Sequence, residues 1–209
     1  MKKKEIDRLI ENWNKRNIGA SYFCDKIKAK EKILESIPAE SEIGISGSQT
    51  LEQLGIIKEL ELKGYKIYNQ YKEGLTRQES LELRRQGSNA DCYLASANAI
   101  AYTGELVFFS AFGNRIAGIS QAKKVILVCG VNKIVPTLEE AIKRAREYVA
   151  PLNCKRLNYN SACFNDGICR KDICFGPAYK RMCCQLLILE AEAIEQRLNV
   201  FLIEDNLGF

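Results

Sequence analysis

Five of the chain's nine cysteines lie close together, in the segment SACFNDGICRKDICFGPAYKRMCC from Ser161 to Cys184. From Cys163 their spacing is C-x5-C-x4-C-x8-C-C, and Cys154 lies nine residues upstream. Because the chain has no histidine, sulfur must supply any soft metal ligand. Four thiolates on one glycine-containing loop can converge on a tetrahedral zinc ion or on an iron–sulfur cluster. The spacing therefore predicts a metal site formed by Cys163, Cys169, Cys174 and one of Cys183 or Cys184.

The composition of this segment supports a metal-binding insertion over residues 154–184. It lacks strong periodicity and has little apolar surface to fold on, so a metal must supply the free energy that orders it. Basic side chains can offset the charge of thiolates or of an anionic cluster, and four flank the cysteines: Arg170, Lys171, Lys180 and Arg181. Free or disulfide-linked thiols are the alternative, although cysteines rarely cluster in this way without a metal.

A second candidate site is the turn ISGSQTL, which follows a short apolar strand. Gly47 lets the backbone turn tightly, and Ser48, Gln49 and Thr50 present N–H and hydroxyl donors at the start of a helix. The unpaired amides and the helix dipole would stabilise a phosphate or a carboxylate. We predict an anion site over these four residues, with a capped turn that binds no ligand as the alternative.

Polar residues interrupt the apolar strands in the stretch SANAIAYTGELVFFSAFGNRIAG, residues 96–118. Glu105 is the candidate catalytic residue, because a carboxylate beside a crevice can act as a base or a nucleophile. The alternative is an ion pair between Glu105 and Arg115 that only joins two loops. Lys133, just after a later strand, is a further contact for an acidic ligand. We expect these groups to meet the Gly47 turn at the carboxyl edge of a parallel sheet. The other candidate ligand contacts are Asn98, Thr103, Gly104 and Asn114.

The elements that must position these residues alternate between helices and strands. Helical patterns cover residues 3–15, 25–36, 47–64, 76–87 and 137–150, and Pro151 is expected to end the last of them. Capping-box spacing marks the helices that begin near Thr50, Thr76 and Thr137. Strand patterns cover residues 42–46, 65–69, 90–96, 104–110, 124–130, 184–190 and 198–205. This alternation predicts one α/β domain over 1–209, with N-terminal helices over 1–37 and a largely parallel sheet that has helices on both faces.

The charge and the distribution of the cysteines indicate the cellular compartment and the kinds of partner that the protein is expected to have. The net charge of +5 comes from 31 basic and 26 acidic residues that are mixed along the chain, which favours anionic small molecules over nucleic acid. The N-terminal stretch is amphipathic rather than continuously apolar, and no segment is long enough to cross a membrane. Cysteines gathered in one third of the chain are atypical of a secreted disulfide scaffold. We expect a cytoplasmic protein with reduced thiols and neither nucleic acid nor membrane as partner.

Five blocks of the sequence, in order, resemble one known family: GISGSQTLEQLG (44–55), ADCYLASANAIAYTGELVFFSAFGNRIAG (90–118), VILVCGVNKIV (125–135), RAREYVAPLNCKRL (144–157) and EDNLGF (204–209). Together they look like the LUD domain of the lactate-utilization protein C type, over nearly the whole chain. The resemblance implies a fold similar to the ribose-phosphate isomerase, glucosamine-phosphate deaminase and CoA transferase group. It also implies a ligand at the Gly47 turn, where related folds bind phosphate or CoA esters, and a role for Glu105 like that of the CoA transferase glutamate.

The resemblance extends to the cysteines. Many LUD-type sequences carry a similar four-cysteine tail, commonly with a central C-x2-C pair, whereas this chain has a wider gap between Cys169 and Cys174. The letters KRMC resemble the end of that tail and favour Cys183 as the fourth ligand, with Cys184 and Cys154 as alternatives. Likeness to a lactate-oxidation system favours a [4Fe–4S] cluster over zinc.

Two functions of different classes follow. The first is a redox protein whose cluster passes electrons to or from a small organic acid pathway, alone or with iron–sulfur partner proteins. The second is an enzyme of the isomerase or CoA transferase type, in which the Gly47 turn binds a phosphorylated or CoA-linked molecule, Glu105 does the chemistry and zinc is structural. Both leave the oligomeric state open, with a homodimer as one option.

Overall fold

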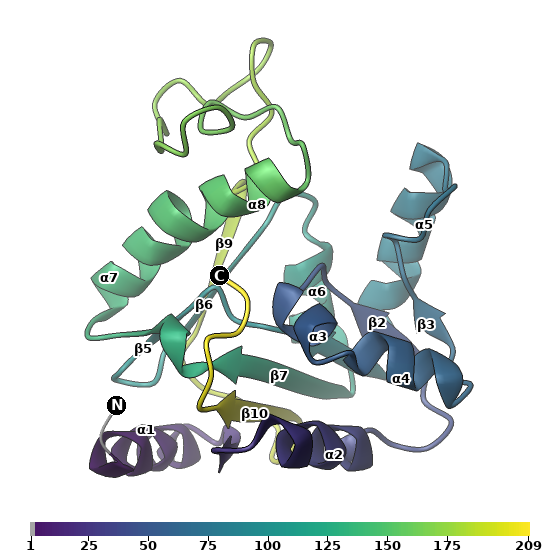
Figure 1. Cartoon of the computed structure of the whole chain (residues 1–209), viewed down its shortest axis with the longest axis vertical. Coiled ribbons are helices and arrows are strands. Elements are labelled where there is room, and N and C mark those ends of the chain that lie inside the picture. Colours follow the sequence, from purple (N-terminus) through teal and green to yellow (C-terminus); the bar gives the residue numbers. More distant parts are fainter. Residues whose placement is uncertain (1–2) are drawn as a thin grey trace.

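Two β-sheets organise the computed structural model, which describes residues 3–209 (Figure 1). The larger sheet has six parallel strands in the order β1-β10-β7-β4-β2-β3. In that order they are Gly19–Phe23, Leu198–Ile203, Lys124–Gly130, Cys92–Ala95, Ile43–Ile45 and Ile67–Tyr68. The predicted α/β class with a parallel sheet is confirmed.

The second sheet was not foreseen as a separate unit. It has the order β8-β5-β6-β9, with strands Ile134–Val135, Ala99–Ala101, Leu106–Ser110 and Gln185–Leu189. Strand β6 is antiparallel to both neighbours. The reason is local, because a short turn at residues 102–105 joins β5 to β6 as a hairpin, and a hairpin imposes antiparallel pairing.

Helices cover both faces of the larger sheet, as predicted. The α-helices are α1 (Lys3–Lys15), α2 (Lys26–Ser36), α3 (Gln49–Gln53), α4 (Ile56–Leu62), α5 (Arg77–Ser88), α6 (Asn114–Gln121), α7 (Leu138–Lys143) and α8 (Ala150–Arg156). Alternate residues of β7 enter different cores: Leu127 packs with α1, α6 and the second sheet, and Val128 packs with α2, α3 and α4. A third core lies between the second sheet and the α7–α8 helix.

Local signals account for most helix starts. Thr76 and Thr137 form the predicted capping boxes with Glu79 and Glu140. The helix after the Gly47 turn differs from the prediction. Its N-cap is Ser48 rather than Thr50, and the helix is divided into α3 and α4.

Pro151 does not end its helix. The chain continues from α7 through a π-helical stretch, Arg144–Val149, into α8, so that one long rod ends at Arg156. In the wider π turn the amide of Ala150 donates to the carbonyl of Ala145, and Pro151 occupies the first turn of α8. A proline is tolerated in a first turn, where its missing N–H has no required partner.

Strand β1 was also missed, because residues 1–37 were expected to contain helices only. Its sequence GASYF is only partly buried and lacks a clear alternation. It forms an edge of the larger sheet through its pairing with β10. The structure shows no helix among residues 3–209 that is long and apolar enough to span a membrane.

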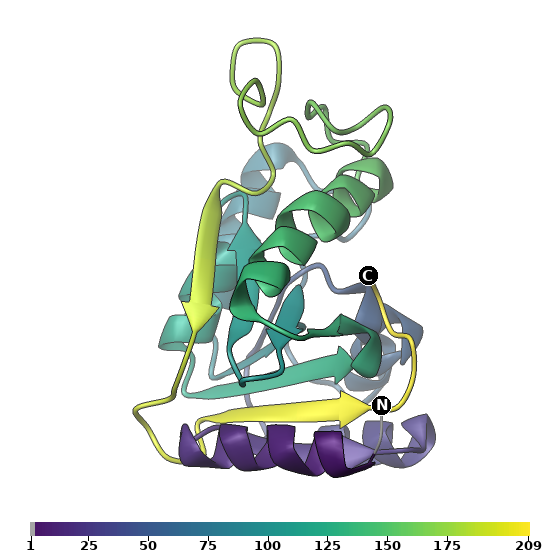
Figure 2. The same ribbon diagram turned by 90° about the vertical axis from the view of Figure 1, so that its left-hand side faces the viewer.

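The cysteine segment leaves the body at one end of the molecule. Residues 157–184 form neither helix nor strand, with α8 leading into them and β9 leading out (Figure 2). Cys154 belongs to α8, so the irregular segment is shorter than the predicted insertion. In Figure 1 it lies above α8, far from α1 and α2.

Candidate functional site

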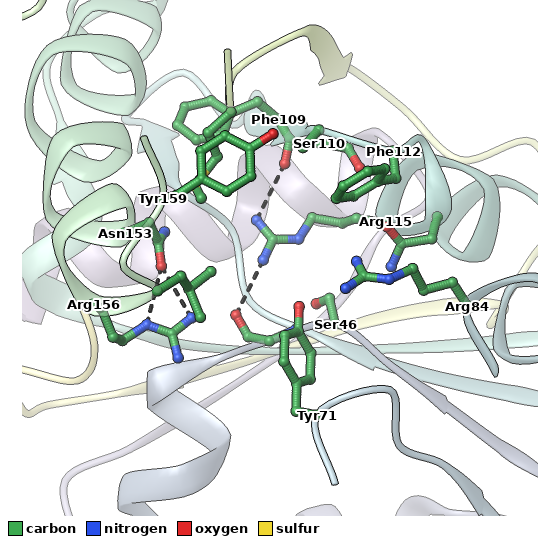
Figure 3. Close-up of a pocket in the computed structure, with 15 residues that line it drawn as sticks. Ser46, Tyr71, Arg84, Phe109, Ser110, Phe112, Arg115, Asn153, Arg156 and Tyr159 are labelled. Carbon is green, nitrogen blue, oxygen red and sulfur yellow. Dashed lines mark hydrogen bonds between the residues drawn. The ribbon is translucent and has the colours of Figure 1, made fainter. Parts of the chain in front are cut away.

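Three arginines from different helices face one pocket of about 350 Å³, which we call the arginine pocket (Figure 3). They are Arg84 of α5, Arg115 of α6 and Arg156 of α8. No Asp or Glu side chain is among the residues that line this pocket. Arg156 pairs with Glu52 at 3.9 Å, whereas Arg84 and Arg115 form none of the ion pairs described for residues 3–209, so the pocket has a net positive charge that suits an anionic ligand.

Arg115 occupies the centre of the pocket and joins two strand ends. Its guanidinium donates to the carbonyl oxygens of Gly47 and Phe109, both at 3.3 Å, and to Oδ1 of Asn98 at 3.1 Å. Gly113, with φ of 82°, lets the chain turn sharply from β6 into α6 and brings Arg115 to this place. Burial lowers the pKa of Arg115, and all three acceptors are neutral. The charge of this guanidinium is therefore free to attract an anion.

Aromatic rings form the rim beside Arg84. Its guanidinium lies 4.7 Å from the ring centre of Phe112 and 5.7 Å from that of Tyr71. The Tyr71 hydroxyl accepts a hydrogen bond from the Gly47 amide at 3.2 Å. This part of the pocket can pack against the apolar part of a bound acid while Arg84 meets its charge.

A smaller cavity of about 30 Å³ adjoins the arginine pocket, and Gly47, Arg115 and Asn153 line both. We call it the lysine niche, because Lys133 lies in it with only 4% of its surface exposed. Lys133 Nζ donates to Ser96 Oγ at 2.7 Å and to Thr50 Oγ1 at 3.0 Å. Burial lowers the pKa of Lys133 to about 8.

Most of the predicted ligand contacts meet at these two cavities. The niche is lined by Gly47, Ser48, Gln49, Thr50, Asn98, Arg115 and Lys133, and Asn114 lines the arginine pocket. Carboxyl ends of parallel strands share a sheet edge, which explains why residues so distant in sequence come together. Ligand binding by these residues stays a prediction.

The structure places Glu105, Thr103 and Gly104 elsewhere, on the β5–β6 turn beside α1. The carboxylate of Glu105 pairs with Arg16 at 2.8 Å and accepts a hydrogen bond from Thr103, so the ion pair with Arg115 that was the alternative is not formed. The indole N–H of Trp13 donates to the carbonyl of Gly104 at 2.9 Å. Glu105 precedes β6 whereas Arg115 follows it, so the two residues lie at opposite ends of one strand. The expectation that Glu105 converges with the Gly47 turn is therefore not met.

Several pocket residues had not been singled out from the sequence. Asn153 and Arg156 fall inside a block that resembles the LUD domain, and that likeness was the available signal. Arg84 and Tyr71 carried no such signal, because one is a charged residue on an amphipathic helix and the other lies in a polar loop.

A third cavity, of about 10 Å³, is lined by five cysteines: Cys154, Cys163, Cys169, Cys174 and Cys183. We call it the cysteine cavity. Cys184 points away, because it is exposed and its thiol donates to the carbonyl of Arg181 at 2.8 Å. The four predicted ligands thus face one space, with Cys154 of α8 as a fifth thiol.

The cysteines of this cavity are not arranged as a ready-made metal site. Among residues 3–209, no three side chains of His, Cys, Asp or Glu are arranged so that they could hold a single metal ion. The four predicted ligands line one cavity, but their expected convergence on a single metal centre is not seen within residues 3–209.

The thiols and their basic neighbours are consistent with a thiolate-bound group. Burial raises the pKa of Cys154 to about 12 and also raises that of Cys169, so a metal would have to displace a proton from each thiol in order to bind it. The buried Nε of Arg181 lacks a hydrogen-bond partner within the described part of the chain, and a cluster sulfur could accept from it. The other basic residues that line the cavity are Arg146, Arg170 and Lys171.

Met182 connects the cysteine cavity with the arginine pocket, because it lines both. The Met182 sulfur lies 3.9 Å from that of Cys154. Leu157 and Tyr159, at the start of the irregular segment, also line the arginine pocket. The segment that carries most of the thiols therefore forms one wall of the arginine pocket.

Comparison with known proteins places this geometry in context. The family model for the LUD domain matches residues 6–203. A solved structure of a DUF162 family protein from Deinococcus radiodurans is similar, with a TM-score of 0.56, 11% sequence identity and coverage of 96% of each chain. At that identity the likeness shows the fold alone. No curated protein matches the sequence.

Proposed function

Because the chain belongs to the LUD domain family, we propose that it is a redox protein that binds a small organic acid in the arginine pocket and an iron–sulfur cluster in the adjoining cysteine cavity. Membership in this family indicates a function related to lactate utilization. The observation that carries the proposal is the wall shared by the two cavities, at Met182.

The arginine pocket accounts for the choice of an acid. A carboxylate that accepts hydrogen bonds from Arg84, Arg115 or Arg156 would gain about 1.5–3 kcal/mol from each charged contact. The pocket is larger than a three-carbon acid needs, and its apolar wall at Phe109, Phe112 and Leu157 leaves room for a longer body.

Cys163, Cys169, Cys174 and Cys183 would hold the cluster, and Cys154 supplies a further thiol from the rigid helix. When bound, a [4Fe–4S] cluster supplies one-electron redox chemistry. Oxidation of a 2-hydroxy acid to a 2-oxo acid releases two electrons and two protons. Iron–sulfur partner proteins are therefore needed to take electrons onward. A cytoplasmic location, the absence of nucleic-acid and membrane partners and the option of a homodimer stay predictions.

The isomerase or CoA transferase alternative is less well supported. It needs Glu105 beside the ligand, and Glu105 instead pairs with Arg16 on the β5–β6 turn. Its structural zinc and the proposed cluster would use the same cysteines, so the cysteines do not separate the two proposals.

Purification without oxygen, followed by metal and acid-labile sulfide analysis, tests the cluster. We expect about four irons and four sulfides per chain and an absorbance band near about 400 nm that dithionite bleaches. Colourless protein with zinc and no iron would overturn the proposal in favour of the alternative.

Calorimetric titration with L-lactate and with pyruvate tests the acid site. Arg84→Gln should weaken the binding of at least one acid about tenfold, because a charged contact is lost. Arg85→Gln is the matched control, since Arg85 is the next residue of α5, is 80% exposed and does not line the pocket. If the two variants bind the acids with equal affinity, Arg84 is not part of the acid site.

A further inference from the structure

Lys133 is a buried lysine without a carboxylate partner. It takes part in none of the ion pairs described for residues 3–209, and its two hydrogen-bond acceptors are the hydroxyls of Ser96 and Thr50. Burial of an unpaired ammonium is costly, so its amine is driven toward the neutral form. A neutral, buried amine is a nucleophile.

Neighbouring groups reinforce this state. Burial is the largest cause of the lowered pKa of Lys133; Cys129 acts in the opposite direction, and the charges of Arg144 and Arg115 lower the pKa further. Arg144 is held by the main-chain oxygens of Asn98, Asn132 and Phe209 at 2.6, 3.1 and 3.4 Å. With a pKa of about 8, roughly a tenth of the amine is neutral at pH 7.

The cavity around this amine limits what can reach it. The lysine niche has a volume of about 30 Å³, enough for a group of water or carbonyl size, and it adjoins the 350 Å³ arginine pocket. A ligand that reaches Lys133 must therefore present a small polar group while its larger, charged part stays with the arginines. Gly208 keeps the niche open, since a Cβ there would lie 2.7 Å from Thr50 Oγ1 and 3.3 Å from Lys133 Nζ.

We propose that Lys133 forms an imine with the carbonyl carbon of a 2-oxo acid whose remaining part occupies the arginine pocket. This proposal rests on the proposed function, because it uses the acid site in the arginine pocket. It adds that the acid bound there is a 2-oxo acid.

The step balances without an oxidant or reductant. The lone pair of the Lys133 nitrogen forms the N–C bond, and the carbonyl π electrons move to oxygen. That oxygen takes up a proton, and the resulting carbinolamine loses water to leave a C=N bond. The hydroxyls of Ser96 and Thr50, which contact the nitrogen at 2.7 and 3.0 Å, can carry the proton between nitrogen and oxygen.

Reductive trapping tests the proposal. The full-length protein is incubated with pyruvate and sodium cyanoborohydride, which adds hydride to the C=N bond, and is then measured by intact mass and peptide mapping. We expect one reduced pyruvate adduct per chain, on Lys133. L-lactate, which has a hydroxyl in place of the keto group, should give none under the same conditions.

Matched variants separate a specific site from general amine reactivity. Lys133→Arg keeps a cation but removes the nucleophile, and should lose at least about nine-tenths of the adduct. Lys72→Arg is the control, because Lys72 is an exposed lysine next to Tyr71 of the pocket rim. Ser96→Ala keeps the amine and should slow trapping at least about tenfold, as expected when a proton-carrying hydroxyl is removed. Melting temperatures establish that each variant is folded.

Adduct on surface lysines or on the N-terminal amine, with Lys133 unmodified, would overturn the proposal. So would equal trapping in wild type and Lys133→Arg. These outcomes leave iron content and lactate binding unaffected, whereas protein that lacks iron can still form the adduct. Failure of this proposal and failure of the proposed redox function are therefore distinguishable.

Discussion

The sulfur atoms of Cys154 and Met182 lie 3.9 Å apart, where the end of the α7–α8 rod contacts the irregular segment. Cys154 belongs to α8 and Met182 to the irregular segment, so this contact joins the helix to the segment that carries the other cavity cysteines. Met182 also lines the arginine pocket. A change of order in the cysteine segment should therefore alter the acid site as well.

Serine at Cys163, Cys169, Cys174 or Cys183 should release or destabilise the metal, because each thiol faces the cysteine cavity. The segment should then become sensitive to protease while the α/β body stays folded. Iron analysis and limited proteolysis measure the two effects. Cys184→Ser and Cys24→Ser are the controls, since both side chains are exposed and outside the cavity. Iron loss in the controls to the same extent would contradict the assignment.

Arg115→Ala should weaken the binding of lactate or pyruvate by tenfold or more, because a hydrogen bond to a charged group contributes about 1.5–3 kcal/mol to binding. It should also lower stability, because the carbonyls of Gly47 and Phe109 lose their donor. Arg84→Gln, which breaks no described ion pair of residues 3–209, should weaken binding without that loss. Calorimetry and thermal unfolding of both variants make the comparison. An Arg115→Ala protein that is less stable but binds as wild type would assign Arg115 a purely structural role.

Glu105 should contribute stability through Arg16 and not ligand binding. Burial raises the pKa of Glu105, but its hydrogen bonds with Thr103 and Arg16 and the charge of Arg16 prevail, so the net shift is downward. A lowered folded pKa gives stability that is present above the unfolded value of about 4.3 and is lost as pH falls through the folded value. Glu105→Gln should therefore cost about 1 kcal/mol at pH 7 and progressively less in acid. Urea unfolding of both proteins across this pH range tests it, and a difference that does not change with pH would count against the ion pair.

Lys133 should make stability rise with pH as well, but in an alkaline window. Its folded pKa of about 8 lies below the usual 10.5, so between these values the unfolded chain binds more protons and stability rises with pH. Relative to Lys133→Met, wild type should gain up to about 3 kcal/mol from pH 8 to pH 10.5. The groups that face Lys133 are Thr50, Ser96, Cys129, Arg115 and Arg144, and all are present in both proteins. Denaturant midpoints measure the difference, and parallel curves would show that Lys133 keeps an ordinary pKa.

Local features of the fold could be predicted from the sequence, whereas features that depend on distant contacts could not. The helices that begin after Thr76 and Thr137 could be predicted, because a capping box involves only four consecutive residues. Strand β1 and the passage of the helix through Pro151 depend on partners elsewhere, namely β10 and the π turn. The separate second sheet likewise follows from the pairing of β6 with β9, which are far apart in sequence.

The candidate site shows the same division. The Gly47 turn could be found because a glycine followed by polar N-terminal residues of a helix is a local pattern. Arg84 could not, since its role comes from α5 lying beside α6 and from rings at Tyr71 and Phe112. Glu105 was misplaced because its neighbours in sequence did not reveal at which end of β6 it lies.

The position of β10 between β1 and β7 also constrains how the chain assembles on the ribosome. Strand β1 emerges early, yet within the larger sheet its described pairing is with β10, which is made about 175 residues later. Until β10 inserts, β1 has no neighbour in the sheet and one edge of β7 stays open. Such distant pairing slows folding and leaves sheet edges exposed to other chains. Nascent chains that stop short of β10 should therefore depend on chaperones, and folding should finish in one late step that closes the sheet.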